Sequence, residues 1–226
     1  MRPHYIPWII FWIPLIAVHG AYFMGLWEGV AYQCNPYIHG CTTISRAARE
    51  GNAIFLFRGL MMPIAALLVI FWYLQSIWLE QLRQTSQRYL FAIGAISALF
   101  LVLYVNFLGT DGDFNRFLRR YGVVFYFGLT VLAQILSLAS LNKLGEKVSK
   151  KLRVYMNAQL GFIAICWLLA MANLVSKQIG FANEKEIENV IEWFFALFMS
   201  LYFPFAALMW KHSGFQWRFK TNPKQK

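Results

Sequence analysis

Six long runs of apolar residues constrain this chain more than any other feature of its sequence. A helix needs about 20 such residues to cross ~30 Å of hydrocarbon, whereas barrel strands alternate over about ten residues. The runs are continuous, and a backbone in lipid must satisfy its own hydrogen bonds, so each run predicts a helix. We therefore expect an all-α polytopic membrane protein, one bundle of six transmembrane helices over about residues 5–26, 53–79, 90–108, 121–141, 154–175 and 190–210.

The composition excludes two other classes of protein. Of the 226 residues, 59% are hydrophobic and 14% are charged, whereas soluble domains carry about 25% charged residues. An aromatic share of 18% also argues against disorder, because disordered chains are poor in aromatic residues.

The first run exceeds the ~7–15 residues of a signal-peptide core, so we expect an uncleaved span.

The net charge of +11 becomes informative once it is divided between the two sides of a membrane. With both termini on one side, that side carries 13 Lys and Arg against two acids, and the other carries eight against eight. The positive-inside rule then predicts that both termini are cytoplasmic. The membrane is a bacterial inner membrane or a eukaryotic endomembrane or plasma membrane. The basic, aromatic tail 211–226 is either an anchor on anionic lipid or a flank that fixes topology, and nucleic acid is not an expected partner.

The first outer loop, Trp27–Asn52, is the longest segment outside the spans. It holds Cys34 and Cys41, seven residues apart, on the expected oxidising side, which favours a disulfide over two free thiols. Within the spans, Gly94 with Ala98 and Gly25 with Gly29 form small-xxx-small pairs, which are typical of close helix packing.

Polar residues concentrate near the outer ends of the spans. Ionisable groups at membrane depth are costly unless they are paired or face a wet cavity. We expect Arg58 to pair with Glu28, Asp111 or Glu192, either as a binding pocket in which arginine holds a phosphate or carboxylate, or as structural ion pairs. The histidines and cysteines show no metal-ligand spacing and no phosphate-loop motif occurs, so no metal and no cofactor is expected.

Two stretches resemble the Frag1/DRAM/Sfk1 family of membrane proteins. The first comprises Asn35-Pro-Tyr-Ile, then Thr43-Ile-Ser-Arg-Ala-Ala-Arg-Glu-Gly51 and Ile54-Phe-Leu-Phe-Arg58. The second is Phe107-Leu-Gly-Thr-Asp-Gly-Asp-Phe114, leading into Tyr121-Gly-Val-Val-Phe-Tyr-Phe127.

The resemblance implies six spans and a role in lipid handling, including remodelling of glycosylphosphatidylinositol anchors and control of lipid asymmetry. By position it points to Ser45, Arg58, Asp111 and Arg120. Family members often carry a histidine at the opening of the fourth span, where this chain has Arg120 or Tyr121, so a histidine-dependent role does not carry over.

These observations predict a protein that binds a lipid or lipid-linked substrate in an outer-facing polar pocket, for remodelling or for presentation to a partner. The expected binding residues are Glu28, Arg58, Asn106 and Arg120. If the protein is an enzyme, acyl transfer or hydrolysis is expected, with Ser45, Asp111 and Glu192 as the catalytic candidates. Two alternatives remain open. One is a non-catalytic subunit or scaffold of a larger membrane complex, and the other is a small transporter, which the lack of a charged residue at mid-depth disfavours.

Overall fold

Six long helices make up nearly all of the structure, a computed structural model that describes residues 3–180 and 182–216. They are α1 (Tyr5–Trp27), α4 (Ala53–Arg83), α5 (Arg88–Phe107), α6 (Asp113–Asn142), α7 (Lys150–Ile179) and α8 (Glu184–His212). Three short helical turns complete the described chain: α2 (Pro36–His39), α3 (Ile44–Ala47) and η1 (Gly145–Lys147). All six long helices are long and apolar enough to cross a membrane, which confirms the predicted multi-pass, all-helical architecture.

Several helices run beyond the ends of the apolar runs. Helix α6 begins at Asp113 instead of 121, and α8 begins at Glu184 instead of 190. An apolar run marks only the part of a helix that fits hydrocarbon, whereas backbone hydrogen bonding continues into the polar region. Acidic residues in the first turn of both helices favour this extension, because a helix N-terminus carries partial positive charge.

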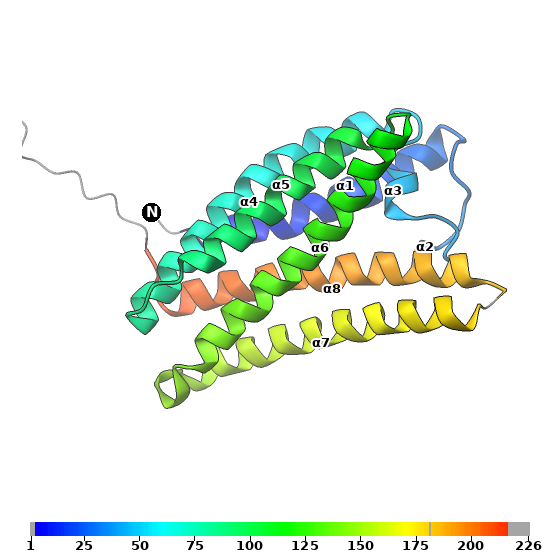
Figure 1. Ribbon diagram of the computed structural model, residues 1–226. Helices are drawn as coiled ribbons and strands as arrows, with labels where there is room; N and C mark the ends of the chain where they lie inside the picture. The colour runs from blue at the N-terminus through cyan, green and yellow to red at the C-terminus, as the bar shows by residue number, and fades with distance from the viewer. Residues whose placement is uncertain (1–2, 181, 217–226) are drawn as a thin grey trace, which may run out of the picture.

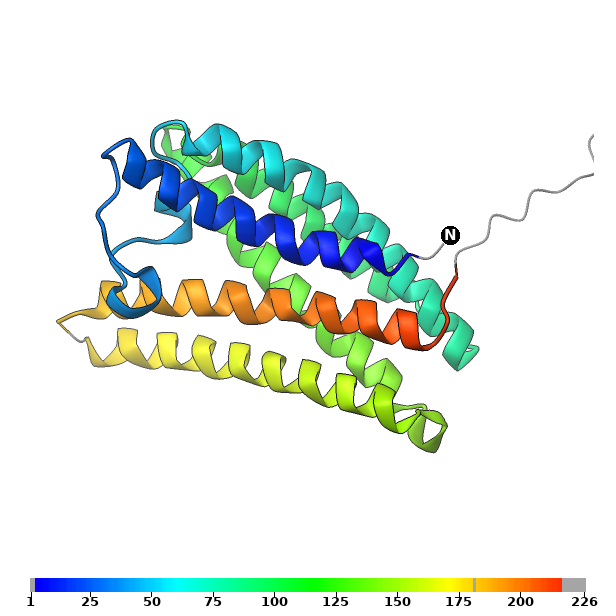
Figure 2. The same ribbon diagram turned by 180° about the vertical axis from the view of Figure 1, so that it is seen from behind.

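The bundle has two distinct ends (Figures 1 and 2). We call the end where α1 begins and α8 finishes the terminal end, and the opposite end, which holds α2 and α3, the loop end. Helices α1, α4 and α5 lie side by side, and α7 and α8 form an antiparallel pair that meets them through α1. Helix α6 starts beside α5 at the loop end and crosses to α7 at the terminal end.

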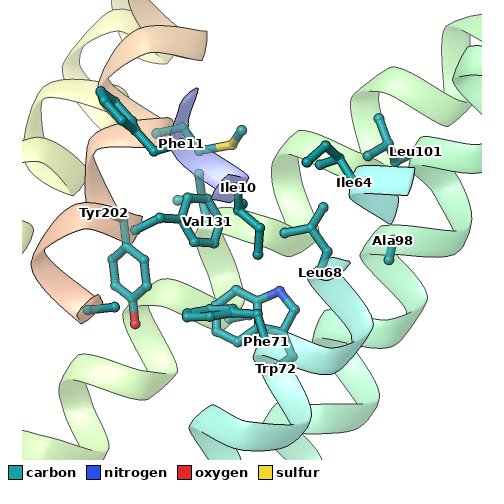
Figure 3. Packing of buried hydrophobic residues seen from close by; sticks show 14 of the residues in the cluster. Ile10, Phe11, Ile64, Leu68, Phe71, Trp72, Ala98, Leu101, Val131 and Tyr202 are labelled. Atoms are coloured by element: carbon teal, nitrogen blue, oxygen red, sulfur yellow. The ribbon is translucent and has the colours of Figure 1, made fainter. Parts of the chain in front are cut away.

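The core is built from large side chains of α4 packed against its neighbours (Figure 3). Leu68, Phe71 and Trp72 of α4 are fully buried. Trp72 stacks against Tyr202 of α8, with ring centroids 6.2 Å apart. On the outside of the bundle α7 exposes apolar side chains such as Leu168, as expected for a surface that faces lipid.

Gly94 sets the distance between α4 and α5. A Cβ atom at this position would overlap the Trp72 ring, so only glycine allows the two helices to pack this closely. The predicted packing role of the Gly94–Ala98 pair is confirmed. The prediction for Gly25 and Gly29 is wrong, because α1 ends at Trp27 and Gly29 adopts a positive φ of 72° beyond it.

The first loop is folded back onto the bundle. The predicted disulfide between Cys34 and Cys41 is confirmed, and Cys166 is a free, buried thiol. Two side chains of α8 hold the loop: Asn189 donates to the Gly40 carbonyl at 2.6 Å, and Trp193 donates to the Thr42 carbonyl at 2.9 Å.

His19 of α1 and Tyr37 of α2 form a second attachment of this loop. The Nδ1 atom of His19 lies 2.8 Å from the Leu15 carbonyl, which can only accept, so Nδ1 carries the proton. The Nε2 atom is then an acceptor for the Tyr37 hydroxyl at 3.1 Å. Burial raises the pKa of Tyr37 above its usual value of 10.0, so this hydroxyl stays a donor at neutral pH.

Candidate functional site

Glu28 has a structural position at the start of α4. Its carboxylate accepts hydrogen bonds from the backbone N–H of Asn52 at 2.9 Å and from the Asn52 side-chain amide at 2.7 Å. Asn52 is the residue that caps α4. Glu28 therefore ties the end of α1 to the beginning of α4 and satisfies a helix N-terminus.

Arg58 also holds two helices together. Its guanidinium donates to the carbonyls of Val105 at 3.2 Å, Asn106 at 3.0 Å and Leu108 at 2.6 Å. These carbonyls close the C-terminal end of α5, where a helix carries partial negative charge and lacks internal donors.

The expected ion pair of Arg58 with Glu28, Asp111 or Glu192 is not formed. Among the side chains that the structure describes, Arg58 forms no salt bridge with these acids, whereas Arg116 pairs with Asp113 at 3.5 Å and Lys177 with Glu188 at 2.8 Å. The carbonyls of α5 satisfy Arg58 instead, so the charge pairing inferred from position along the chain is wrong.

The remaining predicted residues lie at the loop end but do not gather around Arg58. The Asn106 amide donates to the Val102 carbonyl of its own helix, and Arg120 is exposed on α6. Asp111 is exposed and lines a polar cavity described below. The binding role predicted for Asn106 and the catalytic role predicted for Asp111 stay predictions; Arg120 lines neither of the two cavities described below, and the site proposed from them does not include it.

A polar cluster does form nearby, around the hydroxyl of Tyr104 on α5. Tyr104 is buried, and its hydroxyl lies against the Ser45 side chain, within electrostatic range of Glu192, Arg119 and Arg49. The carboxylate of Glu192, in the third turn of α8, faces the backbone N–H groups of Ile44 and Ser45. We call Ser45, Arg49, Tyr104, Arg119 and Glu192 the loop-end cluster.

A polar cavity adjoins this cluster and shares two of its arginines. Its volume is about 420 Å³, and it lies between the loop after α3 and the connection from α5 to α6. We call it the arginine cavity, and its lining residues are Arg49, Glu50, Gly109, Thr110, Asp111, Gly112, Arg116 and Arg119. Three guanidinium groups and two carboxylates make it suited to a phosphate or carboxylate, which arginine binds bidentately.

An apolar crevice lies deeper, on the side of α6 that faces α7 and α8. Its volume is about 250 Å³, and its lining residues are Gly128, Val131, Leu132, Ile135, Cys166, Trp167, Ala170 and Phe195. Residues 119 and 128 are nine positions apart on α6, which corresponds to about 13 Å along the helix axis. The crevice and the arginine cavity are separate spaces.

Helix α8 links the crevice to the loop-end cluster. Phe195 lines the crevice and packs edge-on against Phe127 of α6, with ring centroids 5.5 Å apart. Glu192 lies three residues before Phe195 and so shares its face of α8, about one turn closer to the loop end. A polar cluster therefore lies about one helical turn from an apolar crevice.

The catalytic roles predicted for Ser45 and Glu192 stay predictions. A serine nucleophile needs an adjacent base; the hydroxyl of Ser45 lies against that of Tyr104, and the carboxylate of Glu192 faces the backbone of Ile44 and Ser45. No group of three or more His, Cys, Asp or Glu residues in the described part of the chain could hold a metal ion.

Sequence reasoning missed Tyr104 altogether and did not select Arg49, Arg116 or Arg119 from the polar residues of the loop end. Tyr104 lies inside an apolar run and has no neighbour in sequence that distinguishes it from a core aromatic residue. The arginines had a signal, because residues 116 and 119 are three apart and therefore share a face of a helix.

Comparison of the chain with protein-family models, with curated proteins and with solved structures finds no match. The resemblance to the Frag1/DRAM/Sfk1 family therefore rests on the residues quoted above and stays a prediction.

Proposed function

We propose that this membrane protein binds a lipid or lipid-linked substrate at the loop end of the bundle, for remodelling or presentation. The observation that carries the proposal is the loop-end cluster, which lies about one turn of α8 from the apolar crevice and shares Arg49 and Arg119 with the arginine cavity. The phosphate of the lipid would bind Arg49, Arg116 and Arg119, and an acyl chain would lie along the crevice beside Phe195.

The loop end faces away from the cytoplasm in this proposal. Two observations support that orientation. The side with the termini carries 13 Lys and Arg and the other side eight, and basic residues are more frequent on the cytoplasmic side. The disulfide lies at the loop end, and disulfides persist in oxidising compartments. A bacterial periplasm, an organelle lumen and the cell exterior all meet this condition. The resemblance to the Frag1/DRAM/Sfk1 family agrees with a lipid ligand.

Lipid that remains with the purified protein tests the proposal. The protein is purified in mild detergent, and its lipids are extracted and compared by mass spectrometry with those of the host membrane. We expect one class with a phosphate headgroup to be enriched in the wild type, because each arginine of the cavity contributes a charge-assisted contact.

Arg119 and Arg120 provide matched variants for this experiment. Arg119 is half-buried and lines the arginine cavity, whereas its neighbour Arg120 is exposed and does not line it. Arg119→Ala should abolish the enrichment and Arg120→Ala should retain it. A lipid profile equal to that of the host membrane in the wild type, or an equal loss in both variants, would refute the proposed site.

A catalytic step is tested separately with Glu192, the acid closest to the crevice. Wild type and Glu192→Gln are incubated in vesicles with a phospholipid that carries labelled acyl chains. Release or transfer of an acyl chain by the wild type alone would add acyl chemistry to the proposed function. The absence of any product from either protein restricts the role to binding and presentation.

A further inference from the structure

A stripe of polar residues runs along the buried face of α6 in the half of the bundle near the terminal end. Thr130, Gln134, Ser137 and Ser140 follow one another at spacings of four, three and three, which places them on one face of the helix. Their exposed fractions are between 0% and 2%. We call this stripe the polar seam.

The part of the seam near the terminal end is fully hydrogen-bonded. Arg83 donates to the Ser140 hydroxyl at 2.9 Å, and Ser140 donates to the Gln87 side chain at 2.6 Å. One turn deeper, Gln75 donates to Ser137 at 2.8 Å and accepts from the Trp210 indole at 2.7 Å.

The deeper part of the seam is not satisfied by the protein. Gln134 and Gln159 turn their amide nitrogens to backbone carbonyls of α8, those of Met199 at 3.1 Å and Tyr202 at 2.9 Å. Because a carbonyl only accepts, the Oε1 atom of each glutamine is left without a partner among the described residues, and so is the Thr130 hydroxyl.

The Tyr202 hydroxyl adds a fourth unsatisfied atom. It lies near the side chains of Ser137 and Gln75 but makes no hydrogen bond of acceptable geometry with either. In the described part of the chain, two other buried side-chain atoms are unpartnered, the Trp72 indole nitrogen and the Asn173 Oδ1 atom. The Trp72 ring stacks on Tyr202, whereas Asn173 lies on α7 nearer the loop end.

We propose that the deep part of the polar seam binds ordered water molecules between α6, α7 and α8. Four unpartnered polar atoms, from Thr130, Gln134, Gln159 and Tyr202, lie on three helices, and the two glutamines bind carbonyls one turn apart on α8. A buried water satisfies about three such groups at once. Water that reaches Thr130 lies about 18 Å along α6 from Asn142, at the terminal end.

The seam is closed toward the loop end. The next turn of α6 presents Tyr126 and Phe127, and Phe127 packs against Phe195. This apolar layer separates the seam from the loop-end cluster. The apolar crevice lies beside the seam, at the depth of Thr130 and Gln134, but its lining is apolar and the proposed water binds the buried polar atoms instead.

Radiolytic hydroxyl-radical footprinting of the detergent-purified protein tests the proposal. Radicals generated from a bound water react with adjacent side chains even when these are inaccessible to bulk solvent. Tyr202, with 0% of its surface exposed, and Met199, whose carbonyl accepts from Gln134, report on the seam. Met61, equally buried in the apolar core, is the matched control for Met199.

We expect Met199 and Tyr202 to be oxidised faster than Met61, on the order of tenfold, because the bound water is in contact with the seam. Thr130→Val combined with Gln134→Leu should reduce both rates to that of Met61. Equal, slow oxidation of all three residues in the wild type would overturn the proposal.

The single variant Thr130→Val gives a second measurement, which does not depend on the double variant folding. If the hydroxyl is bonded to water, the isosteric valine loses that bond and Tm falls by about 2 to 4 °C. If the hydroxyl is buried dry and unsatisfied, valine removes a desolvation penalty and Tm rises. A rise in Tm contradicts bound water at Thr130.

Discussion

The guanidinium of Arg58 donates a hydrogen bond of 2.6 Å to the carbonyl of Leu108, which follows the last turn of α5. With the bonds to Val105 and Asn106, one side chain of α4 closes the end of its neighbour. An arginine inside an apolar run is thus explained without a ligand and without an acidic partner.

Replacement of Arg58 by alanine should destabilise the protein. Three hydrogen bonds from a charged group are lost, and such bonds contribute about 1.5 to 3 kcal/mol each when buried. Because Arg58 is only half-buried and water replaces part of these bonds, we expect a loss of about 2 to 4 kcal/mol. Thermal unfolding in detergent measures the change. Arg120→Ala, on the exposed face of α6, is the control and should change stability by less than about 0.5 kcal/mol. Equal effects of the two variants would contradict a structural role for Arg58.

The disulfide of the first loop should make the stability of the protein sensitive to reductant. Replacing Cys34 and Cys41 together by serine frees a short closed loop and should cost about 2 to 3 kcal/mol. A reductant should lower the Tm of the wild type but leave the Tm of the double variant unchanged, because Cys166 is already a free thiol. If a reductant also lowered the Tm of the double variant, the loss of stability would not come from the Cys34–Cys41 disulfide.

Gly94 and Gly161 make a matched pair for testing helix packing. A Cβ atom at Gly94 would overlap the Trp72 ring, whereas one at Gly161 of α7 meets nothing within 4 Å. Gly94→Ala should destabilise the protein by about 1 to 3 kcal/mol through overpacking. Gly161→Ala should be neutral or stabilise by up to about 1 kcal/mol, because alanine favours helix. Unfolding midpoints of both variants decide the comparison, and a tolerated Gly94→Ala would refute the close packing of α4 on α5.

Tyr37 should contribute a pH dependence to stability in the alkaline range. Burial raises the pKa of Tyr37 in the folded protein above 10.0, while the unfolded chain loses this proton near 10. Between these two pKa values the folded state binds more protons than the unfolded chain. The stability that protonated Tyr37 contributes is therefore complete below pH 10 and declines as pH rises toward the folded pKa.

The measurement compares the slopes of stability against pH for the wild type and Tyr37→Phe. The variant also loses the hydrogen bond to His19, which shifts its stability at neutral pH, so the difference between slopes above pH 10 is the informative quantity. The wild type should lose stability more steeply. Parallel slopes would mean that Tyr37 does not titrate differently in the folded state.

The sequence predicts the spans well because each span is a continuous run of apolar residues, which can be read without knowledge of the tertiary structure. The ends of α6 and α8 could not be placed, since Asp113 and Glu184 are polar residues that continue a helix beyond the hydrocarbon. The disulfide could be predicted because Cys34 and Cys41 are close in sequence and lie on the same predicted side of the membrane.

The site was harder to predict because its contacts join distant helices. Ser45 and Glu192 were both selected, but their proximity depends on the first loop folding back onto α8. The predicted pairing of Arg58 with an acid was wrong. The positive charge of arginine suggests a carboxylate partner, but Arg58 binds backbone carbonyls of α5. Every residue has such a carbonyl, so the sequence does not identify these partners. The polar seam of α6, by contrast, was present in the spacing of Thr130, Gln134 and Ser137.

The contact between α1 and α8 has a consequence for biosynthesis. Helices α1 and α8 pack together, and the first loop binds Asn189 and Trp193, which are synthesised 149 and 151 residues after their partners Gly40 and Thr42. Helices α1, α4 and α5 can enter the membrane and pair as they are translated. The first loop, however, reaches its final position only after α8 has been inserted. Premature termination before α8 would leave that loop without its principal contacts, so truncated chains should be recognised by membrane quality-control proteases.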